Sequence, residues 1–526
     1  MKVGHLPRGS ARSYPDEIAL VFEKKRVTFA KFWDEVNILS QNFQKLGLRP
    51  GDRVALLLQN CLEYHYAYYA FPLAGGITTP FNNFMSEREL VYCLNYSKPR
   101  FLIYQPSFED TIQLFKRESS NVQDYISTDQ LQPLITEAPE PQPRVKFSKY
   151  STALIIFTGG TTGLPKGVML SHNNVITMIA MAGQMLVQGS KEFKESFLDE
   201  QIKSKMLTAL PLFHGAGLFL ALCSMFGGIT FITQQKFSVI ETLKIIEDEK
   251  VTFVALVPTM LKKFMESSHL KEYNISSLRS IIYGDAPITP TVLGNALNTF
   301  PQADFVQVFG QTEASPVLCI MGAIDHARAR TNRDLLASCG RALPGIEVKV
   351  VDYEGTEVPF GELGEIIARG ENIMQGYWED PDKTAQTLRD GWLHTGDLGK
   401  MDKDGYIYIT GRGKDMIVSG GENIYPIEVE DVLLTHPAVE ECAAIGVPDD
   451  QWGEAVCAIV CLRPNVISGI DVTETELIDY VKARIAKYKA PKTILFRRKL
   501  PKSPQGKILK RKLREPFWKD KERQVH

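Results

Sequence analysis

The sequence lacks an excess of charge of either sign, and this absence argues against several classes of protein. Its 526 residues include 60 Lys or Arg and 62 Asp or Glu residues, which gives a formal net charge of −2. A protein that binds nucleic acid is typically basic, so no nucleic-acid partner is expected. With 44% hydrophobic and 23% charged residues, the composition is that of a folded globular protein.

Cysteine is sparse and is not spaced for a metal site or a disulfide scaffold. None of the eight cysteines forms a CxxC pair, and Cys457 and Cys461 lie in the apolar run 455–462, which predicts a strand. Buried, reduced thiols are therefore expected. The first residues also lack the continuous apolar core of a signal peptide, so a cytoplasmic location is predicted.

No apolar segment combines the length and the continuity of a membrane-spanning helix, which needs about 20 apolar residues. Residues 206–235 carry no Asp, Glu, Lys or Arg, but a proline, a histidine and four glycines interrupt them. We therefore predict a buried βαβ unit with strands at 206–210 and 229–233 and a helix at 218–226. Peripheral contact with a membrane, like oligomerisation, stays open.

The chain is also too long for one hydrophobic core, since single cores stop growing at about 250–300 residues. Strand-like runs alternate with helical patterns before Glu347, which predicts an α/β fold with parallel sheets. Short alternating strands after Glu347 predict a small barrel-like element. We predict a large N-terminal domain over residues 1–412 and a small, mobile α+β domain over residues 413–526.

Positive charge is concentrated near one end of the chain. Residues 487–526 contain fifteen Lys or Arg residues against three acidic residues. Such a segment is either a solvated face or a contact for an anionic partner, such as a nucleic acid, a membrane surface or a polyphosphate.

A run rich in glycine and threonine follows the strand predicted at 153–157. Residues 157–172 read FTGGTTGLPKGVMLSH and lead toward a helical pattern that starts at Asn173. Glycine lets backbone amides approach an anion, threonine adds hydroxyl donors, and Lys166 adds positive charge. The run predicts a phosphate-binding loop, distinct from a Walker loop because Lys166 lies between proline and glycine. Its candidate ligands are Thr158, Gly159, Gly160, Thr161, Thr162, Gly163 and Lys166.

This run resembles the signature loop of the adenylate-forming acyl-CoA synthetases, a superfamily that includes fatty-acyl- and aryl-CoA ligases, luciferase and peptide-synthetase adenylation domains. Gly159 replaces the usual serine of that loop, and Phe309 stands where tyrosine is frequent. Further segments that resemble family motifs follow in the family's order over essentially the whole chain: YGDAP (283–287), FGQTE (309–313), GELGE (361–365), WLHTGD (392–397), GRGKD (411–415), SGGENIYP (419–426) and PQGK (504–507).

The resemblance implies an acid–CoA ligase that uses ATP, Mg²⁺ and CoA. A carboxylate attacks the α-phosphate of ATP to give acyl-AMP and pyrophosphate, and the CoA thiol then displaces AMP to give the thioester. The resemblance makes Glu313 and Thr161 the metal ligands and Thr312 a donor to the α-phosphate. The other residues implied to bind ATP or AMP are Gly284, Asp285, Ala286, Phe309, Gly310, Asp397, Arg412 and Lys507.

The resemblance also implies a rotation of the C-terminal domain about a hinge at Lys414 between the two steps. Lys507 would bridge the substrate carboxylate and the α-phosphate in the first step. Gly420 and Gly421 would line a pantetheine tunnel in the second step, with His214 as its gate. Without the family, the two glycines indicate a hairpin turn and His214 a core histidine.

The substrate is indicated by small, apolar residues in two segments, 213–218 and 310–315. They offer no acidic partner for an amine and no tyrosine for a phenol, which favours an aliphatic, medium- or long-chain fatty acid. The alternatives are an aryl-acid CoA ligase and an acyl-AMP ligase that loads a carrier-protein thiol. A luciferase-like oxygenase and a catalytically inactive binding protein are the other classes considered.

Overall fold

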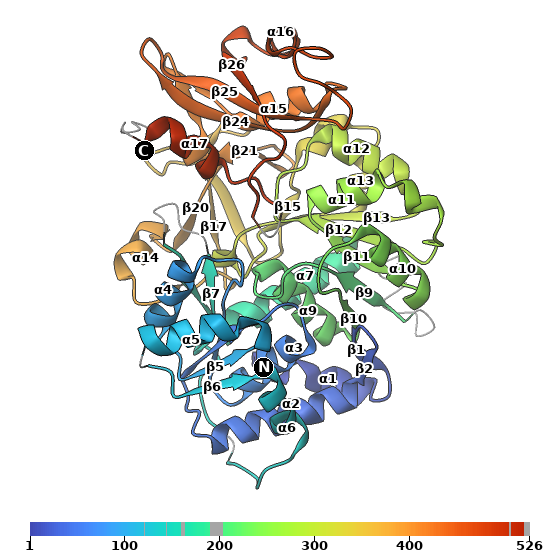
Figure 1. Ribbon diagram of the computed structural model, residues 1–526, viewed down its shortest axis with the longest axis vertical. Helices are drawn as coiled ribbons and strands as arrows, with labels where there is room; N and C mark the ends of the chain where they lie inside the picture. Colours follow the sequence, from blue (N-terminus) through green and yellow to red (C-terminus); the bar gives the residue numbers. More distant parts are fainter. Residues whose placement is uncertain (120, 144, 159–163, 190–202, 504–505, 520–526) are drawn as a thin grey trace.

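The computed structural model describes residues 1–119, 121–143, 145–158, 164–189, 203–503 and 506–519, which form four β-sheets flanked by helices (Figure 1). Three sheets belong to the chain up to Arg412. The fourth belongs to the segment from Ile417, which lies at the top of Figure 1 in orange and red. The predicted α/β class, with a large N-terminal and a small C-terminal part, is confirmed.

The largest sheet has nine strands in the order β15-β14-β13-β12-β11-β9-β10-β1-β2. Its inner strands run parallel, and the pairs at its edges, β1–β2, β13–β14 and β14–β15, are antiparallel. The strands are Ile18–Phe22 (β1), Lys25–Thr28 (β2), Lys205–Thr208 (β9), Thr230–Thr233 (β10), Phe253–Leu256 (β11), Ser280–Gly284 (β12), Asp304–Phe309 (β13), Cys319–Met321 (β14) and Arg341–Ala342 (β15). The helices in this part of the chain are Gly215–Gly227 (α9), Val239–Glu249 (α10), Pro258–Met265 (α11), Pro290–Thr299 (α12) and Ala323–Ala329 (α13).

The predicted βαβ unit is confirmed, because β9 and β10 pair in parallel and α9 connects them. Within the described ranges, none of the helices has the length and apolar character needed to cross a membrane.

The second sheet has seven strands in the order β18-β8-β7-β4-β3-β5-β6. They are Arg53–Leu57 (β3), Ile77–Pro80 (β4), Phe101–Tyr104 (β5), Asp124–Ser127 (β6), Thr152–Thr158 (β7), Lys166–Ser171 (β8) and Gly376–Tyr377 (β18). The helices of this part are Leu6–Ser13 (α1), Phe29–Lys45 (α2), Leu62–Leu73 (α3), Glu87–Ser97 (α4), Glu109–Glu118 (α5), Thr128–Thr136 (α6) and His172–Gly189 (α7).

Strand β8 is an element that the sequence analysis did not predict. Within the run 157–172, residues Lys166–Ser171 form this strand, which pairs antiparallel with β7. Helix α7 begins at His172, one residue before its predicted start at Asn173. Thr158 and Lys166 are cross-strand partners of β7 and β8.

The third sheet contains five antiparallel strands, Glu347–Val351 (β16), Gly364–Arg369 (β17), Leu388–Arg389 (β19), Trp392–Met401 (β20) and Ile407–Arg412 (β21). Helix Pro381–Thr387 (α14) precedes β19. The sheet is open rather than a closed barrel, because β16 lies at one edge while β19 and β21 pair with successive parts of β20 at the other.

The fourth sheet follows a short 3₁₀ turn, Gly413–Asp415 (η6), that contains the predicted hinge residue Lys414. Its strands are Ile417–Ser419 (β22), Glu422–Ile424 (β23), Val439–Asp449 (β24), Gly453–Leu462 (β25) and Thr493–Phe496 (β26), and its helices are Pro426–Leu434 (α15), Glu474–Lys482 (α16) and Lys510–Trp518 (α17). The domain boundary at 412/413 and the rotation about Lys414 stay predictions.

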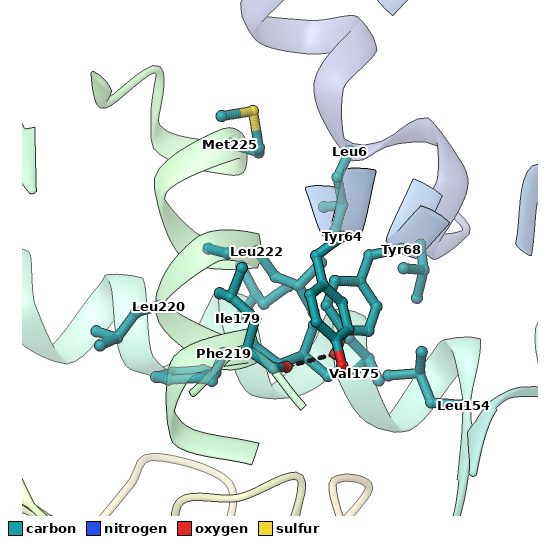
Figure 2. Packing of buried hydrophobic residues seen from close by; sticks show 14 of the residues in the cluster. Leu6, Tyr64, Tyr68, Leu154, Val175, Ile179, Phe219, Leu220, Leu222 and Met225 are labelled. Carbon is teal, nitrogen blue, oxygen red and sulfur yellow. Dashed lines mark hydrogen bonds between the residues drawn. The ribbon is translucent and has the colours of Figure 1, made fainter. Parts of the chain in front are cut away.

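Buried tyrosines of α3 fix the segment that leads into α9. The rings of Tyr64 and Tyr68 stack at 5.6 Å between their centroids, among apolar side chains of α7 and α9 (Figure 2). The Tyr68 hydroxyl donates to the carbonyl of Leu212, two residues before His214. The eight cysteines are free thiols, and all except Cys223 are buried, as the sequence predicts.

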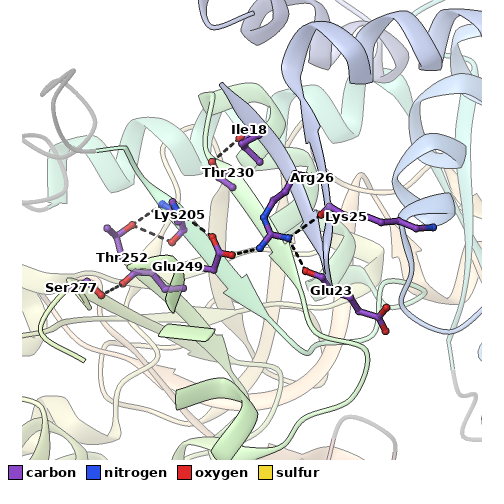
Figure 3. A network of polar contacts seen from close by, with 10 residues as sticks. Ile18, Glu23, Lys25, Arg26, Lys205, Thr230, Glu249, Thr252 and Ser277 are labelled. Atoms are coloured by element: carbon purple, nitrogen blue, oxygen red, sulfur yellow. Dashed lines mark hydrogen bonds and ion pairs between the residues drawn. The ribbon is translucent and has the colours of Figure 1, made fainter. Parts of the chain in front are cut away.

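A polar network holds the edge of the nine-stranded sheet in register (Figure 3). The Glu249 carboxylate at the end of α10 pairs with Arg26 of β2 and with Lys205 of β9, 3.3 Å away. The Thr230 hydroxyl donates to the carbonyl of Ile18 at 2.6 Å, which ties β10 to β1. These contacts anchor the N-terminal hairpin to the sheet.

Some of the positive charge in the basic C-terminal segment is paired with carboxylates of the same domain. Five of its fifteen Lys and Arg residues form ion pairs within the described ranges: Lys489 with Glu428, Lys492 with Asp449, Lys502 with Glu441, Lys510 with Glu430 and Arg514 with Asp415. Part of the charge of the segment is therefore neutralised within the fold, and a contact with an anionic partner stays a prediction.

Candidate active site

Two predicted motifs meet at the carboxyl ends of the parallel strands β12 and β13. Gly284, the last residue of β12, is paired with Val308 in β13, so YGDAP and FGQTE lie side by side. A Cβ at Gly284 would overlap the Val308 carbonyl, so the close approach requires glycine. The next residue, Asp285, has φ +66°, a left-handed conformation that turns the chain across the strand ends.

Gly310 is required by packing and does not open toward a substrate pocket. A Cβ at Gly310 would overlap the carbonyl of Pro316 and would lie 2.8 Å from the backbone nitrogen of Leu318. A bulky residue at position 310 would displace the backbone of residues 316–318. Its main effect would therefore be to destabilise the fold, and it would not be a clean way to narrow a pocket for the acyl chain. Phe309, at the end of β13, is half-buried.

Asp397 and Arg412 form an ion pair between neighbouring strands. They are cross-strand partners in β20 and β21, and Arg412 Nε lies 3.0 Å from Asp397 Oδ1. The Asp397 carboxylate raises the pKa of Arg412. Asp397 is buried, and its second carboxylate oxygen is the group that the predicted ribose contact would use.

Tyr377, a residue that the sequence analysis missed, contacts both Glu313 and Lys166. The hydroxyl of Tyr377, in β18, donates to Glu313 Oε1 at 2.8 Å, and Lys166 Nζ lies 4.9 Å from the centre of the Tyr377 ring. Burial raises the pKa of Tyr377 and the Glu313 charge adds to the shift, so the phenol remains a donor. Burial lowers the pKa of Lys166, against the effect of Glu313.

His214 joins the site as the N-cap of α9. Its Nδ1 accepts from the Ala216 amide at 3.4 Å, and its Nε2 lies 3.8 Å from Asp285 Oδ1. The expectation of an uncharged lining around His214 is therefore wrong at this point, because the fold brings a carboxylate from a distant motif. A Cβ at Gly215 would lie 3.3 Å from Pro316 Cβ and 3.7 Å from Thr312 Oγ1, so the two predicted walls do face each other.

Lys507 reaches this group of residues from the C-terminal domain. Gly506, just before it, packs so closely against Thr259 of α11 that a Cβ would overlap the threonine hydroxyl. Crowding by protein atoms lowers the pKa of Lys507, and the Arg412 charge lowers it further, whereas Asp285 and Asp397 oppose the shift. The Lys507 residue is exposed to solvent.

The predicted CoA residues lie in a hairpin turn. Gly420 and Gly421 connect β22 to β23 with φ +61° and +84°, and the Gly420 amide donates to the Trp452 carbonyl at 2.9 Å. A Cβ at Gly420 would lie 2.5 Å from the Trp452 ring. The turn therefore requires glycine in this orientation, and a role in binding CoA stays a prediction.

Five residues of the predicted phosphate-binding loop lie outside the part of the chain that the structure describes. Gly159, Gly160, Thr161, Thr162 and Gly163 lie outside the described residues, and Thr158 and Lys166 flank them. No cluster of three or more His, Cys, Asp or Glu side chains suited to a metal ion occurs in the part of the chain that the structure describes. Glu313, which retains one carboxylate oxygen beside its bond to Tyr377, fits an ion held by one carboxylate and by phosphate oxygens.

The electrostatics of Lys507 predict how acid activation should depend on pH. The predicted role of Lys507 in stabilising phosphate charge requires the protonated amine, and the pKa of this amine is lowered, so kcat/KM for pyrophosphate release should fall as pH rises through that pKa. The fall should occur at a lower pH than an unperturbed lysine would give. Lys507→Arg should remove this alkaline fall, because a guanidinium stays protonated. An identical alkaline fall in Lys507→Arg would assign it to another group.

Two family models match the chain in the order of its two parts. Residues 8–378 match the AMP-binding enzyme family, and residues 428–507 match the AMP-binding enzyme C-terminal domain. The first match alone covers well over half of the chain.

Relatives and solved structures match over almost the whole chain. A feruloyl-CoA synthase from Amycolatopsis sp. is 34% identical over 98% of this chain and 99% of its own. A long-chain-fatty-acid–CoA ligase from Bacillus subtilis (strain 168) is 33% identical over 96% and 93%. The structure of the amide bond synthetase McbA from Marinactinospora thermotolerans superposes with a TM-score of 0.86 at 30% identity, over 98% and 99% of the two chains. The chain therefore belongs to the AMP-binding enzyme family, as an adenylate-forming acid–thiol ligase of the acyl-CoA synthetase type.

Proposed function

We propose that this enzyme activates an aliphatic carboxylic acid, of medium or long chain length, as its acyl-AMP and then transfers the acyl group to the thiol of CoA. The observation that carries the proposal is the close packing of Gly506, the residue before Lys507, against Thr259 of α11, since it brings the C-terminal motif onto the domain that holds the nucleotide-binding motifs. The charges of Arg412, Asp285 and Asp397 act on the pKa of Lys507, which supports the same placement. ATP and CoA are the co-substrates. A cytoplasmic location is part of the proposal.

In the first step, the residues neutralise and orient two anions that would otherwise repel each other. The Lys507 ammonium binds between the acid's carboxylate and the α-phosphate, where negative charge develops in the transition state. Buried Thr312 donates to the α-phosphate, and Lys166 binds the departing phosphates. Asp397 accepts from the ribose hydroxyls while Arg412 holds its carboxylate in place.

Glu313 is the residue proposed to hold Mg²⁺, together with Thr161. A bound Mg²⁺ would add positive charge beside the β- and γ-phosphates. The bond from Tyr377 fixes the orientation of the Glu313 carboxylate and leaves its other oxygen available. Lys166 lies over the same tyrosine ring. Tyr377 therefore contacts both Lys166 and Glu313, the residue proposed to hold Mg²⁺.

The aliphatic assignment rests on the apolar helix that begins directly after His214. Helix α9 begins at Gly215, where a Cβ would lie 3.3 Å from Pro316 Cβ and 3.7 Å from Thr312 Oγ1, and it continues with almost entirely apolar residues. Asp285 introduces one carboxylate at this end. It faces His214 and lies in the field of the Lys507 ammonium, which already compensates part of its charge. A substrate ammonium is therefore still disfavoured.

A panel of acids tests this assignment. Each added methylene in an apolar site is worth about 0.8 kcal/mol, or about fourfold, so kcat/KM should rise with the length of straight-chain acids until the site ends. Amino acids should be poor substrates, and hydroxylated aromatic acids should gain nothing over unsubstituted ones. The measurement is pyrophosphate release across the panel, with and without CoA.

Two other outcomes would change the assignment in different ways. A clear preference for hydroxycinnamate-type acids would favour an aryl-acid CoA ligase. Pyrophosphate release without acyl-CoA formation, together with loading of a pantetheinylated carrier protein, would favour the acyl-AMP ligase alternative. A kcat/KM that did not change with the chain length of the acid would contradict an aliphatic pocket, whether the acceptor is CoA or a carrier protein.

A further inference from the structure

Helix α11 is one of the parts of the large domain that contact the C-terminal domain. Two of its residues and its C-cap residue Glu266 meet three residues of that domain: Thr259 meets Gly506, Lys262 meets Glu440 and Glu266 meets Arg463. Residues 259, 262 and 266 follow the helical spacing i, i+3 and i+7, so they lie on one face of the helix.

The partner residues gather at one end of the C-terminal sheet and beside Lys507. Val439 of β24 is paired with Leu462 of β25, which brings Glu440 and Arg463 to the same end of that ladder. Gly506 immediately precedes Lys507 in the chain. The single face of α11 therefore contacts both the body of the C-terminal domain and the segment that delivers the lysine.

We propose that this face of α11, formed by Thr259, Lys262 and Glu266, is the docking surface that holds the C-terminal domain in the orientation for acid activation. The inference rests on the proposed two-step function and adds positioning residues to it. They act through Lys507 and belong to the first step alone, because the rotation about Lys414 would separate them from their partners.

The three contacts differ in strength. Lys262 Nζ is half-buried and donates to the Glu440 carbonyl at 2.7 Å, so it makes a charge-assisted bond in a partly desolvated place. Glu266 and Arg463 are 3.9 Å apart with 43% and 44% of their side chains exposed, and such pairs contribute little. Lys262 is therefore the main polar contact of the surface.

Lys262→Met tests the docking surface, with Lys263→Met as its control. Lys263 is the neighbouring lysine of α11, and its side chain is exposed. Loss of the Lys262 bond should lower the rate of pyrophosphate release about tenfold and leave thioester formation from supplied acyl-AMP as fast as before or faster. Lys263→Met should change neither rate. Equal losses in both half-reactions, or no loss in either, would overturn the proposal.

A charge reversal tests the weaker contact without removing any side chain. Glu266→Arg and Arg463→Glu should each slow pyrophosphate release about threefold, because each places like charges opposite one another. The double variant should recover the original rate, since the pair is restored with its signs exchanged. If the rate loss of the double variant equalled the product of the two single losses, a direct contact would be contradicted.

Hydrogen exchange separates this inference from the proposed function, because it needs no substrate. The amides of residues 506–512 and 438–441 should exchange faster in Lys262→Met than in Lys263→Met if the bond holds the domains together. Absence of pyrophosphate release by the unaltered enzyme with every acid would refute the proposed function, while faster exchange would still support the docking surface. Equal exchange in the two variants would overturn the docking surface.

Discussion

Lys507→Ala should slow acyl-AMP formation by about 10²–10³-fold, which is the usual cost of removing one charge-stabilising contact from a transition state. Lys507 is the group of the C-terminal domain whose charge interacts with Asp285, Asp397 and Arg412. Thioester formation from supplied acyl-AMP should continue near the original rate, because the proposed rotation withdraws the lysine in that step. The measurements are pyrophosphate release for the first half-reaction and acyl-CoA from synthetic acyl-AMP for the second.

The control for Lys507→Ala must account for the strongly basic surroundings. Lys512 lies on α17, five residues further along, with an exposed side chain. Lys512→Ala removes the same charge from the same segment and should leave both half-reactions unchanged. If Lys512→Ala matched Lys507→Ala, the effect would come from the general field of the segment. If Lys507→Ala slowed both half-reactions equally, the assigned role would be wrong.

Much of the fold could be predicted because its strands and helices have strong local patterns. The start of helix α15 is marked locally, since Pro426 stands at its first position. The βαβ unit of β9, α9 and β10 follows from the breaks that glycine and proline introduce into an apolar run. Strand β8 was missed because its alternation, from Lys166 to Ser171, merges with the helical pattern that begins at His172.

In the candidate site too, contacts between motif residues could be predicted from the sequence, whereas contacts between distant segments could not. Register pairing places Gly284 beside Val308 and Asp397 beside Arg412, and motif order was enough to expect both groups in one place. The approach of Asp285 to His214 was missed, because these residues are far apart in sequence and only the sheet brings them together.

Tyr377 and the docking face of α11 were missed for a related reason. Tyr377 contacts Glu313 through a two-residue strand that lies in no motif, and only its position after Gly376, with φ +141°, marks a special backbone. The α11 residues are ordinary for a helix surface, so nothing in their spacing distinguishes a face that contacts solvent from one that contacts a second domain.

Lys414→Pro should suppress thioester formation about 10²-fold while acyl-AMP formation persists. Lys414 is the middle residue of the η6 turn, and the φ usual for a 3₁₀ turn, about −50 to −70°, suits proline, so the orientation seen here should tolerate the change. Arg514 donates to the Lys414 carbonyl at 3.0 Å and pairs with Asp415 at 2.9 Å, and proline preserves both contacts. Rotation would require another φ at this residue, and a proline in an incompatible conformation costs about 3 kcal/mol.

The lysine side chain must be separated from the hinge in this experiment. Desolvation by surrounding protein atoms, together with the neighbouring charges of Arg412 and Lys507, lowers the pKa of Lys414 to about 8, so its loss alone would change the field around Lys507. Lys414→Ala removes the amine but keeps the backbone free, and it should therefore make acyl-CoA far faster than Lys414→Pro. Pyrophosphate release with little acyl-CoA, in Lys414→Pro alone, is the expected pattern. Similar acyl-CoA rates in the two variants would mean that rotation does not occur at Lys414, because only the proline restricts the backbone there.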